Sequence, residues 1–191
     1  MRLTRTVAPA ELPISRDEAK LHCRVEHDEE DTLIDSLIAA AVDYLDGPSG
    51  ILGRAIIEQQ WLLELDAWPS SLALPIEPVS SVTVQYLDKS GTETDVPENQ
   101  LVIVDAPSAR TVLEWVDGFQ APELSDTRYP VKITLTAGFG ATAKELDGIK
   151  VAIKMMVGHW YENRETVVLG MSVAELPMAV SALLARYRVM L

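Results

Sequence analysis

The chain has 191 residues, 48% of them hydrophobic and 24% charged, which is the composition of a folded globular protein and not of a disordered one. Its net charge of −13 argues against a protein that grips nucleic acid through the phosphates, since such binding needs a basic face. No stretch approaches the ~20 apolar residues of a membrane span.

The acidic residues lie mainly in the first three-quarters of the chain. Residues 1–50 carry 5 Lys and Arg against 11 Asp and Glu, residues 51–140 carry 5 against 13, and residues 141–191 carry 6 against 5. Either surfaces that face different partners or solubility alone would explain this split. The single cysteine and the lack of an apolar signal-peptide core lead us to expect a protein of the cytoplasm, or of a particle assembled there.

The first fifty residues predict two helices. Residues 1–14 are expected to be extended, and Ser15–Glu18 form a capping box that begins a short helix ending near Arg24. The acidic run Asp28–Asp31 begins a second helix, because negative charge favours a helix N-terminus, and Gly47-Pro48 ends it. The apolar stripe of this helix repeats at helical spacing and comprises Leu33, Ile34, Leu37, Ile38, Ala40, Ala41, Tyr44 and Leu45.

The middle of the chain changes to a period of two, which predicts strands. Apolar and polar residues alternate over residues 57–65, 82–86 and 131–136, and residues 101–104 and 111–116 are further short strands. Prolines and turn residues separate these segments. Because no strand alternates with a long helix, the pattern predicts an antiparallel sheet or small sandwich and not a Rossmann-like sheet.

Helical spacing returns after residue 140. Thr142–Glu145 is a second capping box, and a broad apolar face follows over residues 149–161. A last helix is expected to begin near Pro177, since proline suits a first helical position.

We therefore predict an α+β fold. A helical bundle from both chain ends, residues 1–50 and 141–191, would carry an inserted antiparallel β-sheet or small β-sandwich over residues 51–140. We find no internal repeat and no low-complexity segment.

The sequence offers no convincing catalytic, cofactor or metal site. His22, Cys23 and His27 are close in sequence, but a five-residue step puts the two imidazoles on different helix faces, and no second ligand cluster exists. His159 lies on a core-facing helix, where packing explains it better than base catalysis. Gly138–Gly140 lacks the third glycine and the lysine of a phosphate-binding loop. We therefore expect no enzyme, no cofactor and no metal ion.

Three stretches resemble the head–tail connector (adaptor) proteins of long-tailed bacteriophages and gene transfer agents. They are Ser15-Arg16-Asp17-Glu18-Ala19-Lys20-Leu21-His22 with the apolar stripe that follows it, His159-Trp160-Tyr161-Glu162-Asn163-Arg164-Glu165, and Leu176-Pro177-Met178-Ala179-Val180-Ser181-Ala182-Leu183-Leu184-Ala185-Arg186-Tyr187-Arg188. The order of helices, β block and helices also agrees, so the likeness covers nearly the whole chain. The β block diverges most.

The resemblance implies a structural virion protein assembled in the host bacterial cytoplasm. Members of that family form a homo-oligomeric ring of about a dozen copies below the portal, often from monomers, and carry a stopper or tail protein. For this chain, residues 1–50 and 141–191 would build the ring. The C-terminal segment would reach the portal, with Arg186, Tyr187 and Arg188 as contacts.

Such a ring extends the channel through which DNA passes without specific binding. An acidic channel repels phosphates, so we predict an acidic face toward the channel or its rim. That face would comprise Asp28, Glu29, Glu30, Asp31 and Asp35. The alternative is that these acidic residues only favour the start of the helix and face solvent on the outside, and it accounts for their presence equally well.

Wide apolar helix faces also predict contacts between subunits. The candidates are Trp160, Tyr161, Leu183 and Leu184. For the aromatic pair, packing between the β block and the last helix is the simpler explanation. The loop Glu162–Ser172 is expected to become ordered on a neighbouring subunit or on the portal.

Three other functions stay open. A tail-completion or stopper protein should consist mainly of β structure, without strong terminal helices. A small-ligand-binding protein or hydrolase on the β block would need converging polar residues, for which Asp105, Glu114 and Asp117 are candidates. An acidic inhibitor of a basic host protein is the third.

Overall fold

The computed structural model describes residues 1–105, 110–142, 146–164 and 178–189. Three features predicted from the sequence lie wholly or partly outside these ranges, namely the capping box at Thr142–Glu145, the loop Glu162–Ser172 and the helix start at Pro177. The described chain contains helices and antiparallel sheets, so the predicted α+β class is confirmed.

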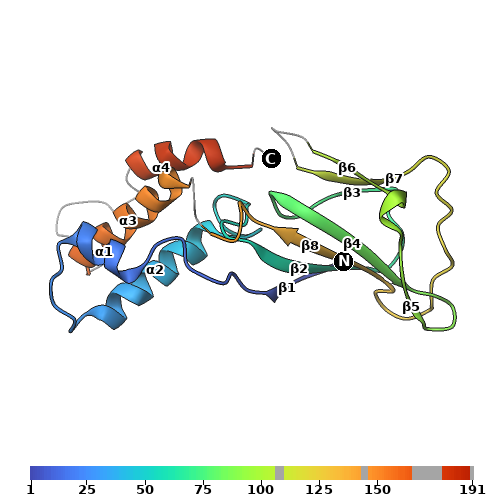
Figure 1. Ribbon diagram of the computed structural model, residues 1–191, viewed down its shortest axis with the longest axis horizontal. Helices are drawn as coiled ribbons and strands as arrows, with labels where there is room; N and C mark the ends of the chain where they lie inside the picture. The colour runs from blue at the N-terminus through green and yellow to red at the C-terminus, as the bar shows by residue number, and fades with distance from the viewer. Residues whose placement is uncertain (106–109, 143–145, 165–177, 190–191) are drawn as a thin grey trace.

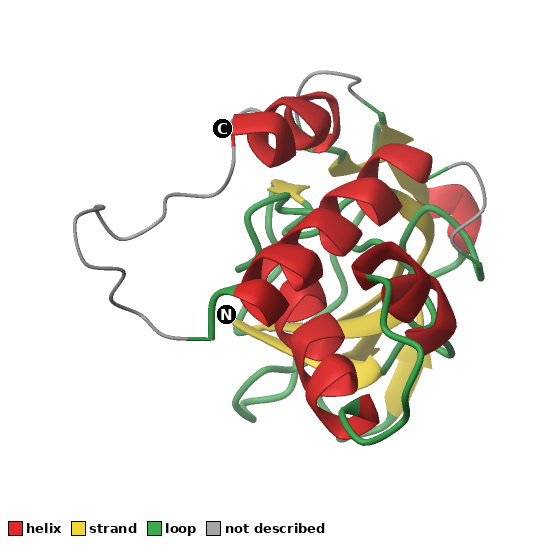
Figure 2. Cartoon of the chain, turned by 90° about the vertical axis from the view of Figure 1, so that its left-hand side faces the viewer, coloured by secondary structure: helices red, strands yellow, loops and turns green. Residues whose placement is uncertain are grey.

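The helices gather at one end of the molecule and the strands at the other (Figure 1). From the N-terminal part come α1 (Arg16–Cys23) and α2 (Asp31–Leu45), and from the C-terminal part α3 (Asp147–Glu162), α4 (Met178–Leu184) and the 3₁₀ helix η2 (Ala185–Tyr187). Helix α3 contacts α1, α2 and α4, so helices from both chain ends pack together. Seen from the helical end, they stand in front of the strands (Figure 2).

The predicted capping box begins α1. The Ser15 hydroxyl accepts a hydrogen bond from the Glu18 amide at 3.1 Å, and the Ser15 amide donates to the Glu18 carboxylate at 2.9 Å. Two amides at the helix start, which have no partner inside the helix, are thereby satisfied. The helix ends before Arg24, whose φ of 57° is the left-handed conformation that often follows a helix.

The strands form two antiparallel sheets. The five-stranded sheet has the order β1 (Arg2–Val7), β2 (Gln59–Leu65), β8 (Val131–Ala137), β4 (Val79–Leu87) and β5 (Glu93–Asp95). The three-stranded sheet has the order β3 (Ser71–Ala73), β7 (Val112–Trp115) and β6 (Leu101–Val104), and the 3₁₀ helix η1 (Glu98–Gln100) leads into β6. The alternation predicted for β8 is confirmed, because Val131, Ile133 and Leu135 are fully buried.

Strands β1, β3 and β5 were not predicted from the sequence. Strand β1 pairs with β2 from Arg2 opposite Glu64 to Val7 opposite Gln60, so the extended N-terminus joins the five-stranded sheet. None of its side chains is buried, so no alternation marks the strand in the sequence. The other two have only three residues each, which is too short for a period to appear.

Two hydrophobic cores lie at the two ends of the molecule. The helical core contains Ile34, Ile38, Leu45, Ile149, Ile153, Met156, Val157, Val180 and Leu184, together with Leu52, Ile56 and Ile57 from the segment after α2. The β core contains Leu63, Leu74, Ile76, Val84, Leu113, Val131, Ile133 and Leu135. The domain boundaries at residues 50 and 140 stay a prediction.

A polar network around Asp46 joins the two ends. The Asp46 carboxylate accepts hydrogen bonds from the Ile56 amide at 2.7 Å and from Gln59 Nε2 at 3.1 Å. Arg5 Nη1 lies 3.9 Å from this carboxylate and donates to Gln59 Oε1 at 3.4 Å. Gln59 is only 1% exposed, and buried polar groups of this kind need such partners. The network therefore ties β1 and β2 to the end of α2.

Candidate functional site

The acidic residues predicted to face a channel lie at the α1–α2 end, where cations of α1 bind most of them. Arg16 Nε donates to Asp35 at 2.7 Å, and Arg16 Nη1 donates to Asp31 at 2.8 Å. Lys20 Nζ donates to Asp28 at 2.6 Å and to Asp31 at 2.8 Å. Asp31 therefore sits between both cations and connects the two helices.

These contacts change the protonation equilibria of the carboxylates. The hydrogen bond from Lys20 holds the pKa of Asp31 below its usual value, and the hydrogen bond from Arg16 does the same for the pKa of Asp35. Both acids thus stay ionised further into the acid range than free aspartates do.

Glu30 connects α2 to the end of α3. The Tyr161 hydroxyl donates to Glu30 Oε2, and Arg164 Nη2 lies 2.6 Å from Glu30 Oε1. The Tyr161 hydrogen bond and the Arg164 guanidinium lower the pKa of Glu30, while the Glu30 carboxylate raises the pKa of Tyr161. The sequence had not indicated this contact, because Glu30 precedes α2 and Arg164 follows α3, far apart in the chain.

Asp28 and Glu29 are the most exposed members of the acidic group. Their side chains are 88% and 83% exposed, and Glu29 lies 2.8 Å from His27 Nδ1. Asp31 and Asp35 are 25% and 45% exposed and are held by α1. The placement of the group on a channel stays a prediction, and within it Asp28 and Glu29 are the residues most open to a partner.

The C-terminal segment predicted to reach a portal is docked on the body of the subunit. The Tyr187 ring lies over Gly148 of α3 and meets Phe139 edge-on, with the ring centroids 6.1 Å apart. The Val189 amide donates to the Leu52 carbonyl at 3.1 Å. Tyr187 thus anchors the segment within its own subunit.

The two arginines beside Tyr187 differ in their surroundings. Arg186 is exposed, and its guanidinium carbon lies 5.0 Å from the centroid of the Tyr187 ring. Arg188 is half-buried, and its Nε has no hydrogen-bond partner among the residues that the structure describes. Of these two arginines, Arg186 is therefore the one better exposed to a partner.

The predicted subunit-packing residues belong to the helical core or its margin. Leu184 is fully buried, so its side chain packs within its own subunit. Trp160, Tyr161 and Leu183 are partly buried against the helical core. These three keep some surface for a neighbour, and their role between subunits stays a prediction.

One side of α2 presents an apolar stripe that the monomer covers only in part. Leu33 and Leu37 are half-buried, whereas Ala40 and Tyr44 are exposed, Tyr44 to 45%. The spacing of these residues places them in one row along the helix. Ile51 follows the row, because its amide donates to the Tyr44 carbonyl at 3.0 Å. We call these five residues the α2 stripe.

No metal site emerges from the described residues. They contain no group of three or more His, Cys, Asp or Glu side chains that could hold a metal ion. His22 and Cys23 of α1 lie against Gly158 of α3. Burial, with a smaller effect of the Glu162 charge, raises the pKa of the Cys23 thiol and makes it less reactive.

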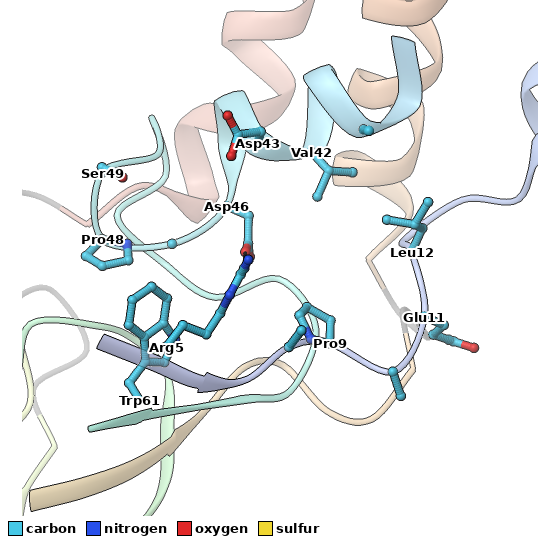
Figure 3. A pocket seen from close by; sticks show the side chains of 14 residues that line it. Arg5, Pro9, Glu11, Leu12, Val42, Asp43, Asp46, Pro48, Ser49 and Trp61 are labelled. Atoms are coloured by element: carbon cyan, nitrogen blue, oxygen red, sulfur yellow. Dashed lines mark ion pairs between the residues drawn. The ribbon is translucent and has the colours of Figure 1, made fainter. Parts of the chain in front are cut away.

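A pocket of about 600 Å³ lies between the N-terminal segment and the end of α2 (Figure 3). Apolar residues and four charged ones, Arg5, Glu11, Asp43 and Asp46, line it, and Arg5 and Asp46 already belong to the network that joins the two ends. Asp105, Glu114 and Asp117 are exposed and do not line it. The pocket therefore does not gather the residues predicted for a hydrolase on the β block. Within the described ranges, no helix is long and apolar enough to cross a bilayer.

Comparison with known proteins agrees with the resemblance seen in the sequence. Residues 14–100 match the family of phage gp6-like head–tail connector proteins. No curated protein matches the chain.

Several solved structures share the fold along the whole chain. A protein of the native gene transfer agent virion is 27% identical with a TM-score of 0.78, and one of the neck of the empty particle, computed with C6 symmetry, is 28% identical with a TM-score of 0.78. A protein of the native particle neck, computed with C12 symmetry, is 28% identical with a TM-score of 0.75. Each alignment covers 100% of this chain and 96% of the other. The chain is thus a relative of the phage gp6-like head–tail connector proteins, as the motifs of its sequence predict.

Proposed function

We propose that copies of this chain form a ring in the neck of a tailed phage, prophage or gene-transfer particle, where the ring joins head to tail. The observation that carries the proposal is the likeness, along the entire chain, to proteins of a particle neck. The family match over residues 14–100 supports the same function from the sequence side. In this proposal the subunit is structural and catalyses no reaction.

The number of copies is proposed from symmetry. The related neck of the native gene transfer agent was computed with C12 symmetry, which supports a ring of twelve. A closed ring repeats one contact between two different surfaces of the subunit. The α2 stripe is one candidate for such a surface, because it is apolar and remains partly exposed in the monomer.

The partners are proposed to be the portal on one side and a stopper or tail protein on the other. Arg186 is the proposed portal contact, since it is exposed beside a segment that Tyr187 fixes in place. Assembly would take place in the host cytoplasm, and DNA would pass through the ring without specific binding. The acidic end with Asp28 and Glu29 is proposed to face the channel or its rim.

The rival functions have less support. A stopper protein should be dominated by strands, whereas four helices from both chain ends build one core here. A ligand-binding protein or hydrolase on the β block would need Asp105, Glu114 and Asp117 to converge in a pocket, and none of them lines the pocket at α2.

Co-assembly with the portal of the same phage or prophage tests the proposal. The full-length chain is mixed with purified portal, and the products are examined by electron microscopy. We expect a ring of about twelve subunits stacked on the portal. Wild-type protein that never joins the portal would contradict the proposed function.

Two variants of α2 make the test specific for the α2 stripe. Tyr44→Lys puts a charge on the stripe and should abolish rings or reduce their number severalfold. Ala39→Lys puts the same charge on an exposed position roughly 140° away around the helix and should leave assembly intact. Both substitutions lie on the surface and should change the free energy of unfolding by less than about 0.5 kcal/mol.

A further inference from the structure

Strand β6 lies at an open edge of its sheet. Its side chains are apolar and partly exposed, which is unusual for an edge strand. It ends the three-stranded sheet, and among the strands that the structure describes it pairs only with β7. Val102, Ile103 and Val104 are 38%, 43% and 40% exposed, so side chains on both faces of the strand meet solvent. The strand contains no charge and no proline, and its pairing with β7 shows no bulge. Free edges are normally protected by one of these devices.

The main chain of β6 leaves two residues open to a further strand. The Val116 amide of β7 donates to the Gln100 carbonyl at 3.1 Å, and in an antiparallel pair the direction of the groups alternates along the strand. The groups of Val102 and Val104 therefore turn toward β7. Those of Leu101 and Ile103 turn away from it. The Leu101 amide already donates to the Glu98 carbonyl of η1, so this edge offers the Leu101 carbonyl and the amide and carbonyl of Ile103 for strand addition.

The surroundings of β6 are strongly acidic. Residues 93–117 contain six acidic residues and a single arginine. Glu98, Asp105, Glu114 and Asp117 are exposed and form no ion pair with any residue that the structure describes. A strand that adds here should therefore carry positive charge.

Strand β1 offers the matching edge. It ends the five-stranded sheet, and five of its six side chains are exposed. Residues 1–10 contain Arg2 and Arg5 and no acidic residue, although the chain as a whole has a charge of −13. Arg2 is paired with Glu64 and Arg5 with Asp46 inside the subunit, but the two arginine side chains remain 59% and 46% exposed. β1 and β6 lie along opposite margins of the β part (Figure 1).

We propose that the open edge of β6 pairs with the open edge of β1 of the next copy of this chain, so that main-chain hydrogen bonds join the sheets across each subunit boundary. The inference rests on the proposed ring. Two different edges on opposite margins give a head-to-tail contact, which is the kind that closes into a ring. Each copy then protects the edge of its neighbour.

A proline at position 103 tests the role of the main chain. Ile103→Pro removes an outward amide and leaves the pairing of Val102 and Val104 with β7 in place. Ile103→Thr keeps the amide and the branched side chain and serves as the matched control. We expect Ile103→Pro to remain a folded monomer by circular dichroism and to lose ring formation on the portal, while Ile103→Thr forms rings. Rings formed by a folded Ile103→Pro variant would overturn the inference.

Cross-linking identifies the strand that occupies the edge. In a Cys23→Ser background, one population carries Thr4→Cys or Thr6→Cys and a second carries Ile103→Cys. When both are mixed and assembled on the portal, a short bismaleimide should join the two populations to each other. Cross-links only between two Ile103→Cys copies, or only to the portal, would overturn the β1 assignment. If wild-type protein forms no ring at all, the proposed function fails and this inference fails with it.

Discussion

At the residue scale, Asp31 explains why the acidic run does not force the helices apart. Its carboxylate accepts hydrogen bonds from Lys20 and Arg16, both of α1. Glu30 makes the corresponding contacts with Tyr161 and Arg164. The charge that appears as a single acidic block in the sequence is thus largely neutralised within the helical end, and it joins α1, α2 and α3.

The ion pairs of Asp31 and Asp35 predict a loss of stability in acid. The native pKa values of both carboxylates lie below the value of 3.8 for a free aspartate, so the unfolded chain binds protons first as the pH falls. The stabilisation is fully present above about pH 5 and disappears as the pH falls through the native pKa values. In Asp31→Asn/Asp35→Asn, the free energy of unfolding should be lower at pH 7 and should depend less on pH between 5 and 3. Urea unfolding at several pH values measures this.

Asp43→Asn is the control for the acid prediction. Asp43 is an exposed aspartate on the same helix and forms no ion pair with the described residues. This variant should keep the pH dependence of the wild type. An equal flattening in both variants would show that the ion pairs with α1 do not cause the effect.

At the scale of elements, the packing of η2 on α3 depends on a glycine. A Cβ atom at Gly148 would lie 2.9 Å from Cε2 of Tyr187, which is too close for a carbon–carbon contact. Gly148→Ala should therefore destabilise the subunit by about 1–3 kcal/mol, because the ring and its segment must shift. In a Tyr187→Ala background the clash is gone, and the same change should be neutral or stabilising by up to about 1 kcal/mol.

A double-mutant cycle measures this coupling by urea unfolding of the wild type, both single variants and the double variant. The sign of the Gly148→Ala effect should reverse when Tyr187 is absent. An effect of equal size in both backgrounds would mean that the ring can leave its position without cost.

The elements also show which features a sequence can predict. The capping box at Ser15, the α2 spacing and the alternation in β8 are local patterns, and the structure confirms all three. Strand β1 was missed because both its faces remain accessible, so its sequence carries no alternation. The Glu30–Arg164 pair was missed because it depends on how helices far apart in the chain pack. The open edge of β6 likewise follows from strand order and not from composition.

At the scale of the whole molecule, a ring multiplies the net charge of −13 by the number of copies. Salt limits the reach of that field to roughly 8 Å under physiological conditions, so only acids close to the DNA path matter. In the proposed pairing of β6 with β1, the acidic edge at β6 would meet the basic N-terminal strand, so charge would also direct which surfaces meet. Repulsion of DNA and attraction between subunits then use different parts of one charge pattern.

Reversing the two most exposed acids of the α1–α2 end tests the channel placement. In Asp28→Lys/Glu29→Lys, the pairs of Arg16 with Asp31 and Asp35 remain, so the fold should survive. If these residues face DNA, the new lysines attract phosphates, and infectious titre or gene transfer should fall roughly tenfold or more. DNA release measured in vitro should recover as salt is raised. The control Glu123→Lys/Asp126→Lys makes the same charge change on an exposed loop of the β part and should leave titre unchanged. Equal titres in both variants would place Asp28 and Glu29 away from the channel.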